Sequence, residues 1–254
     1  KADRYIVARA FNNAGYVYFF NFSDYKEAFD RYISALTLAE ENKFDSILPF
    51  VLTNIGNIYY VYGQKERAME YFHKAFKASV STGEEKMLLT SLNNMLLYAF
   101  DAGSVDSIAS DLRVFDTLKL GNGSDVRYTR GMIKSLRALT RDDVSGSLAL
   151  LDSAEPEGGV REKVRNISIR TSLYYRLGRY GEALAECRRL RQYTDMPGAA
   201  DVKVGWLSSM ADTHEALGNI DSAYYYARRH IALSDSIFGR RVYGEIRDLE
   251  ASRH

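Results

Sequence analysis

Between residues 54 and 75, small and aromatic side chains recur at helical spacing. Small residues allow two helix backbones to approach closely, and large rings fill the space beside the crossing. The pattern predicts an antiparallel pair of helices over residues 45–82. Pro49 falls within the first turn of the first helix, where a missing N–H is tolerated. The residues that carry the pattern are Gly56, Tyr59, Gly63, Ala68, Phe72 and Ala75.

The same pattern returns along the chain and predicts six helix pairs followed by a final helix. In the third pair, Leu96 and Ile108 stand where small residues are expected, and in the fourth Ser135 stands at the crossing. These two pairs therefore rest mainly on hydrophobic periodicity. Pro156 and Pro197 fall between pairs, as expected because proline disrupts helix interiors. The predicted ranges are 3–42, 45–82, 84–119, 124–155, 160–195 and 199–238, with a terminal helix at 240–252.

Two connectors between predicted helices, at residues 21–24 and 120–125, have distinctive sequences. The helices of the first pair are predicted over residues 3–21 and 24–42, with Ser23 as the N-cap of the second helix and Glu27 in its first turns. The turn between Asn21 and Asp24 holds one residue more than the pattern requires. Residues 120–125, LGNGSD, contain two glycines and are the expected place of a bend between two halves.

The spacing of Gly56, Tyr59, Ala68, Phe72 and Ala75 resembles the tetratricopeptide repeat (TPR). The resemblance implies an all-α fold, a right-handed superhelical α-solenoid of about six TPR-like helix pairs plus a C-terminal helix, as one domain over residues 1–254. The first pair resembles the repeat as well, but its glycine lies 41 residues before that of the second. The usual period is about 34 residues, so both helices are expected to carry extra turns. The first pair matches at Gly15, Tyr18, Ala28, Tyr32 and Ala35.

The net charge and the distribution of apolar residues bear on whether the chain binds nucleic acid or a membrane. The chain holds 34 Lys plus Arg and 33 Asp plus Glu, a net charge of +1 that gives no general attraction to nucleic acid or an anionic membrane. Neither a signal peptide nor an apolar run of about 20 residues is found, so we expect no membrane insertion by this segment. The first residue is Lys1 and not Met, so we expect the chain to be part of a longer protein.

The residue types needed for chemistry do not form a recognisable site. His214 and His230 are predicted to face one another beside Glu215, and a hydrogen-bonded structural pair is favoured over a metal site. Cys187 is predicted to be a buried core thiol and not a nucleophile. The GNG at 121–123 lacks the Gly-Lys-Ser/Thr ending of a phosphate-binding loop and is interpreted as a connector. We therefore expect no enzyme activity, catalytic residue, cofactor or metal.

Arginines gather in the C-terminal half of the chain. Most are interpreted as opposing helix dipoles at helix ends, with a patch for an acidic partner as the alternative. The clusters are Arg188, Arg189 and Arg191, then Arg228 and Arg229, then Arg240 and Arg241.

The TPR resemblance also implies a partner-binding groove, lined by the first helix of each pair. Asparagine and tyrosine on this face suit an extended peptide, because the amide bonds backbone groups and the ring supplies contact area. The alternative is that the face is only the packed inner wall of the superhelix. The matching positions are Asn12, Tyr16, Phe19, Thr53, Asn57, Tyr60, Asn93, Ser168, Ser172 and Tyr175, with Leu97 and Phe100 beside Asn93.

The C-terminal region indicates a biological setting. Residues 233–238, LSDSIF, and 245–251, EIRDLEA, resemble the exit from the TPR array in a family of bacterial regulators. This resemblance implies a protein- or peptide-binding scaffold that serves as the sensory or interaction segment of a bacterial signalling or transcriptional regulator. It favours the periplasmic side of a membrane-tethered protein over the cytoplasm. A free-standing TPR adaptor that assembles a protein complex is the alternative, and a solvent-capping role for the final helix stays open.

Overall fold

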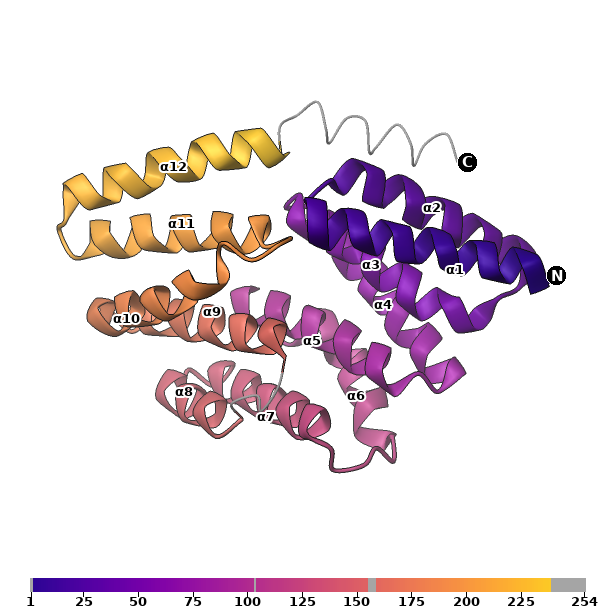
Figure 1. Ribbon diagram of the computed structural model, residues 1–254. Helices are drawn as coiled ribbons and strands as arrows, with labels where there is room; N and C mark the ends of the chain where they lie inside the picture. Colours follow the sequence, from indigo (N-terminus) through magenta and orange to yellow (C-terminus); the bar gives the residue numbers. More distant parts are fainter. Residues whose placement is uncertain (1, 103, 155–158, 239–254) are drawn as a thin grey trace. The chain divides into compact units, whose positions relative to one another are not determined.

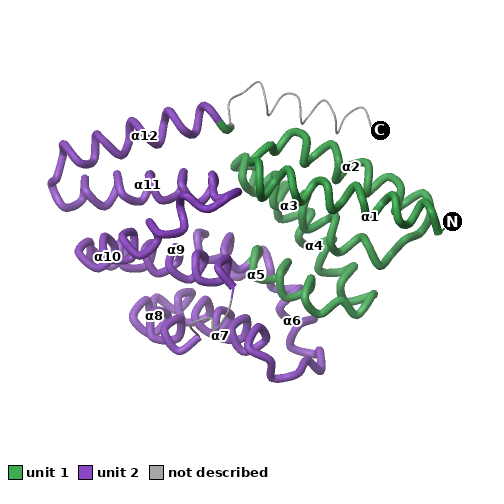
Figure 2. Tube along the Cα trace, viewed as in Figure 1, with its two compact units in different colours: residues 1–95, 237–254 green, residues 96–236 purple. Residues whose placement is uncertain are grey.

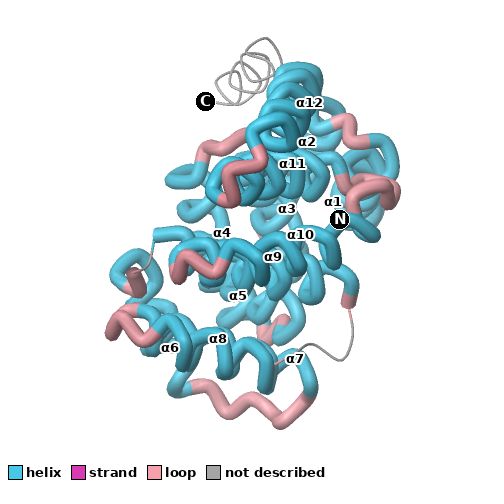
Figure 3. The backbone as a smooth tube through the Cα atoms, turned by 90° about the vertical axis from the view of Figure 1, so that its left-hand side faces the viewer, coloured by secondary structure: helices cyan, strands magenta, loops and turns pink. Residues whose placement is uncertain are grey.

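The computed structural model describes residues 2–102, 104–154 and 159–238 (Figure 1). Within these ranges all regular structure is helical and no strand occurs (Figure 3). Twelve α-helices pack mainly against their neighbours in sequence, α1 on α2, α3 on α4, α7 on α8 and α9 on α10. The predicted all-α class with paired helices is therefore confirmed.

The chain divides into two compact units, residues 1–95 with 237–254 and residues 96–236 (Figure 2). The division falls inside helix α5 and not in the glycine-containing connector at 120–125. The reason lies in the first part of α5, where Ser91 and Asn94 bond to side chains of α3 and so belong to the first unit. The helices of the first unit are α1 (Ala2–Val17), α2 (Tyr25–Asn42), α3 (Leu48–Val61), α4 (Lys65–Thr82) and the start of α5 (Glu85–Ala102).

Glycines stand where the paired helices of the first unit cross. A methyl group added at Gly15 of α1 would lie 2.6 Å from the ring of Tyr32 on α2. One added at Gly56 of α3 would lie 2.5 Å from the ring of Phe72 on α4. Both rings are fully buried. The predicted role of these two glycines is confirmed, since a side chain at either position would displace a core ring.

The turn between α1 and α2 takes up the extra residue as a π-helical turn, Tyr18–Phe22, after which Ser23 adopts a left-handed conformation with φ of 53°. The backbone N–H of Asp24 bonds to the carbonyl of Tyr18 at 3.0 Å. The prediction that Ser23 caps α2 is wrong, because the helix begins one residue later. Asp24 is the N-cap, and its carboxylate accepts a bond of 3.1 Å from the backbone N–H of Glu27.

Pro49 occupies the first turn of α3, as predicted. It follows a short 3₁₀ turn, Asp45–Ile47, that leads the chain from α2 into the helix. Its missing N–H leaves no intrahelical hydrogen bond broken.

The second unit repeats the paired arrangement. In the α7–α8 pair the crossing is polar: the Ser135 hydroxyl lies 2.7 Å from that of Ser147 and donates to its carbonyl at 2.8 Å. Gly131 provides a further close approach, because a methyl group there would collide with Ala154. The elements are η3 (Asp106–Ile108), α6 (Ala109–Thr117), α7 (Ser124–Leu139), α8 (Val144–Ser153), α9 (Val160–Arg176), α10 (Tyr180–Leu190), η4 (Arg191–Tyr193), α11 (Ala200–Ala216) and α12 (Ile220–Phe238).

Helices α9 to α12 share one hydrophobic core. Trp206 of α11 is its largest member, and its indole N–H donates a 3.0 Å bond to the carbonyl of Cys187 on α10. Tyr226 of α12 meets the same indole edge-on, with ring centroids 5.6 Å apart. The buried members are Ile167, Leu184, Cys187, Leu190, Trp206, Leu207 and Met210.

We predict that Gly56→Ala destabilises the protein. Replacing a helical glycine by alanine gains about 1 kcal/mol of helix propensity, whereas overpacking a core costs about 1–3 kcal/mol. Because Phe72 is buried and has no space to yield, the loss of unfolding free energy should reach about 2 kcal/mol. Urea denaturation followed by circular dichroism measures this.

The matched control is Gly205→Ala, which also lies inside a helix, α11, but would meet no other atom within 4 Å. This variant should be stabilised by up to about 1 kcal/mol. Equal stabilisation of both variants would show that the crossing at Gly56 is not tight.

Candidate functional site

Polar side chains link the first helices of successive pairs in the first unit. The amide oxygen of Asn12 accepts a 3.0 Å bond from Asn54, which joins α1 to α3. The amide oxygen of Asn57 accepts a 2.9 Å bond from Asn94, which joins α3 to α5. We call these two amide pairs the asparagine seam. The seam joins three helices. The two bonded asparagines are 42 residues apart in the first pair and 37 residues apart in the second.

A third polar contact lies deeper. The hydroxyl groups of Thr53 on α3 and Ser91 on α5 are 3.0 Å apart, and both side chains are buried. Each hydroxyl also bonds to a carbonyl one turn earlier in its own helix. The two hydroxyls have two hydrogens for these three contacts, so the contact places two small polar groups together where α3 meets α5.

The structure separates the groove positions predicted from the sequence by their exposure. Tyr16 has 49% of its surface exposed, and Asn12, Asn57 and Tyr60 are half-buried. These four are accessible to a partner. The remaining predicted positions of the first unit are buried and so are not exposed to a partner in this structure; they are Phe19, Thr53 and Asn93.

The predicted positions of the second unit lie on α5, where Leu97 is half-buried and Phe100 is buried, and on α9. Ser172 is exposed, Ser168 is half-buried and Tyr175 has 39% of its surface exposed. Desolvation, followed by the nearby carboxylate of Asp212, raises the pKa of Tyr175 above its usual value. The phenol therefore stays protonated at neutral pH and can donate a hydrogen bond.

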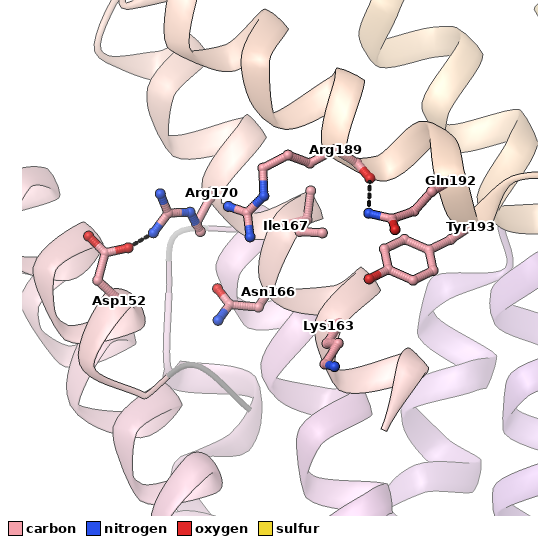
Figure 4. Close-up of a pocket in the computed structure, with 8 residues that line it drawn as sticks. All are labelled: Asp152, Lys163, Asn166, Ile167, Arg170, Arg189, Gln192 and Tyr193. Atoms are coloured by element: carbon pink, nitrogen blue, oxygen red, sulfur yellow. Dashed lines mark hydrogen bonds and ion pairs between the residues drawn. The ribbon is translucent and has the colours of Figure 1, made fainter. Parts of the chain in front are cut away.

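A polar pocket of about 210 Å³ lies elsewhere in the second unit, between α8, α9, α10 and η4 (Figure 4). The sequence analysis did not find it. Polar residues at 163, 166 and 170 interrupt the buried side of α9 at helical spacing, and this interruption was the available signal. The lining residues are Asp152, Lys163, Asn166, Ile167, Arg170, Arg189, Gln192 and Tyr193.

Two of the lining arginines, Arg170 and Arg189, form ion pairs beside the pocket. Arg170 of α9 forms an ion pair with Asp152 of α8 (Figure 4). On its other side it donates bonds of 2.9 and 3.1 Å to Glu186 of α10, whose residue surface is only 5% exposed. Arg189 bonds to the same carboxylate at 3.0 Å. A buried carboxylate is tolerated here because two guanidinium groups neutralise it.

His214 takes a partner other than the predicted His230. His214 stacks on Tyr226, with ring centroids 5.6 Å apart and planes 4° apart, and its Nδ1 lies 3.4 Å from the Asn219 amide. Tyr226 stands one turn before His230 on α12, so the facing position differs by one turn from the prediction. Among the described residues, no three or more His, Cys, Asp or Glu side chains are grouped to hold a metal ion. His254 lies outside these residues.

Cys187 is fully buried, as predicted. Burial raises the pKa of its thiol to about 11, although hydrogen bonds involving Thr213 and Thr171 act in the opposite direction. The thiolate is therefore scarce at neutral pH, which is the behaviour of a core thiol and not of a nucleophile.

The C-terminal arginines are bound to specific groups, in addition to any effect of the helix dipoles. Arg191 bonds to Asp195 at 2.5 Å and lies over the ring of Trp206. Arg228 and Arg229 lie over tyrosine rings one turn earlier on α12, at positions 224 and 225. Arg240 and Arg241 lie outside the described residues.

Comparisons with known proteins found no matching family model and no matching curated protein. Within the part of the chain that the structure covers, no helix combines the length and hydropathy needed to cross a lipid bilayer.

We predict that Cys187 reacts slowly with a disulfide reagent at pH 8 and rapidly once the protein is unfolded in urea. An unfolded thiol has a pKa of about 8.5, against about 11 in the fold, so the thiolate fraction should fall by about two orders of magnitude. Absorbance of the released reagent gives both rates. Comparable rates would show that the thiol is accessible in the folded protein.

The same pKa shift predicts a pH dependence of stability. The folded pKa lies above the unfolded one, so the contribution of Cys187 is complete below pH of about 8.5 and is lost as the pH rises toward 11. Urea denaturation at pH 7 and pH 10 should show this loss. In Cys187→Ala the decrease between the two pH values should be smaller.

Proposed function

We propose that this chain is a non-enzymatic helical-repeat scaffold, an α-solenoid of TPR type, that binds a protein or peptide on its first helices. The observation that carries the proposal is the asparagine seam. It recurs from α1 to α3 and from α3 to α5, and it lies beside the exposed ring of Tyr16. A repeated row of amides next to a ring is a suitable surface for an extended chain.

The chemistry of the seam supports this proposal. Asn12 and Asn57 each give their amide oxygen to a neighbouring helix, which holds the side chain in place. Each keeps its NH₂ group, a donor of two hydrogen bonds, for a carbonyl of the bound chain. Because both amides are already ordered, little side-chain entropy is lost on binding.

We further propose that this scaffold is the sensory or interaction segment of a bacterial signalling or transcriptional regulator. The support is the resemblance at residues 233–238 and 245–251, of which the second stretch lies outside the described residues. In this setting a bound peptide or protein alters the curvature of the array and so the placement of the last helix.

The proposed face can be tested with peptides displayed on phage. Selection against the whole chain should enrich a related set of peptides. Tyr16→Ala should then weaken the binding of a synthetic peptide from that set by about tenfold, the effect typical of a central aromatic contact. Fluorescence anisotropy measures the affinity.

The matched control is Tyr224→Ala, another strongly exposed tyrosine, which lies on α12, the second helix of its predicted pair. Its affinity should stay within about twofold of the unchanged chain. Equal losses in both variants, or none in Tyr16→Ala, would place the peptide elsewhere. Failure to enrich any peptide would contradict peptide binding itself.

A second prediction concerns α3. The double variant Asn57→Ala with Tyr60→Ala should weaken the same peptide while the helical circular dichroism signal stays unchanged. Both side chains are half-buried at the surface of α3 and are not part of its core. Loss of helicity instead of affinity would show that these residues hold the fold and that the face is only a packed wall.

A further inference from the structure

The pocket between α8, α9, α10 and η4 has an excess of positive charge. Lys163, Arg170 and Arg189 line it, against the single carboxylate of Asp152. Glu186 lies behind the wall and bonds two of the arginines, so three cationic and two anionic side chains leave one net positive charge. Within the described chain, the ammonium group of Lys163 has no ion-pair or hydrogen-bond partner. An anionic ligand would supply one.

A second, independent feature is the amide of Asn166, which lies among the lining side chains in Figure 4. The residue is only 4% exposed. Its NH₂ group donates to the carbonyl of Leu151 at 3.4 Å. Its oxygen is buried and accepts no hydrogen bond from any described residue. A buried acceptor without a partner is costly, so a ligand that donates a hydrogen bond here would be favoured.

Ion pairs and a hydrogen bond hold two further lining side chains, Arg170 and Gln192, in place. Arg170 is held by carboxylates on two helices, Asp152 on α8 and Glu186 on α10. Gln192 donates a 3.0 Å bond to the carbonyl of Arg189, which ties η4 to the end of α10 (Figure 4). Ile167, which is 4% exposed, is the one aliphatic residue of the lining.

We propose that this pocket binds a small organic acid that carries a hydroxyl or amino group next to its carboxylate. The carboxylate pairs with Lys163, and Arg189 adds to the positive field. The hydroxyl or amino group donates to the oxygen of Asn166. A pocket of about 210 Å³ holds a molecule of this size and excludes a folded partner.

The pocket is distinct from the proposed peptide face. On α9, Lys163, Asn166 and Arg170 share one side of the helix, because they are three, four and seven residues apart. At 100° per residue, the side formed by Ser168, Ser172 and Tyr175 points about 170° away. One helix therefore carries two binding surfaces of different chemistry.

Two probes that differ by one hydroxyl group test the inference. L-malate and succinate are both four-carbon dicarboxylates, but only malate carries a hydroxyl beside a carboxylate. Titration of the whole chain, followed by chemical shifts of its backbone amides, should show malate binding at least about fivefold more tightly than succinate. The largest shifts should come from residues of α9 and η4.

Variants of the two key residues should separate their roles. Lys163→Met keeps the length of the side chain but removes its charge, and should weaken both acids by about tenfold or more. The matched control is Lys134→Met on α7, an exposed lysine outside the pocket, which should change neither affinity. Asn166→Leu should leave succinate unchanged and remove the advantage of malate. If that variant does not fold, the isosteric Asn166→Asp should weaken both acids by repulsion.

Several outcomes would overturn the proposal. Equal affinities for malate and succinate would exclude a role for the Asn166 oxygen. Unchanged malate binding in Lys163→Met, or no binding of either acid at 10 mM, on the order of the weakest useful affinity, would exclude the anion site. Inorganic phosphate that binds as tightly as malate would assign the pocket to phosphate and not to a carboxylate.

Discussion

The close crossing of paired helices is the constraint on which this fold depends. At Gly15 and at Gly56 the backbone of one helix lies against a buried aromatic ring of the next, so closely that even a methyl group would collide. Each crossing buries a large ring without a cavity, because the absent side chain leaves the room that the ring fills. The α7–α8 pair reaches a similar approach by another means, a bonded pair of serines with Gly131 against Ala154. Small volume is the common requirement, and glycine is one way to meet it.

Several polar groups of the first unit are paired across helices. Thr53 lies opposite Ser91 where α3 meets α5. The asparagine seam pairs amides across helices in the same way at half-buried positions. In the proposed function, Asn12 and Asn57 would both pair the helices and contact a bound chain.

Helix α9 shows how one element serves several purposes. Ile167 enters the core that α9 shares with α10, α11 and α12, and Arg170 forms the ion pairs that join α9 to α8 and α10. The side with Ser172 and Tyr175 remains exposed. The burial of Glu186 is possible only because both of its guanidinium partners are present, so the polar pocket and the packing of these helices depend on each other.

The sequence by itself indicated the all-helical class, the pairing of helices, and the roles of Gly15 and Gly56, because small and aromatic residues recur at spacings that resemble a known repeat of paired helices. It also predicted the burial of Cys187 from its position on the packed side of α10. The N-cap of α2 was predicted one residue too early. It is Asp24 and not Ser23, because the π turn shifts the start of the helix by one residue. Only the tertiary structure decided which polar residues meet. Asn12 finds Asn54, His214 finds Tyr226, and Asp152, Arg170 and Glu186 gather around one pocket. Such contacts join separate helices, and their relative rotation is set by the packing of all their side chains together, which no spacing within one helix records.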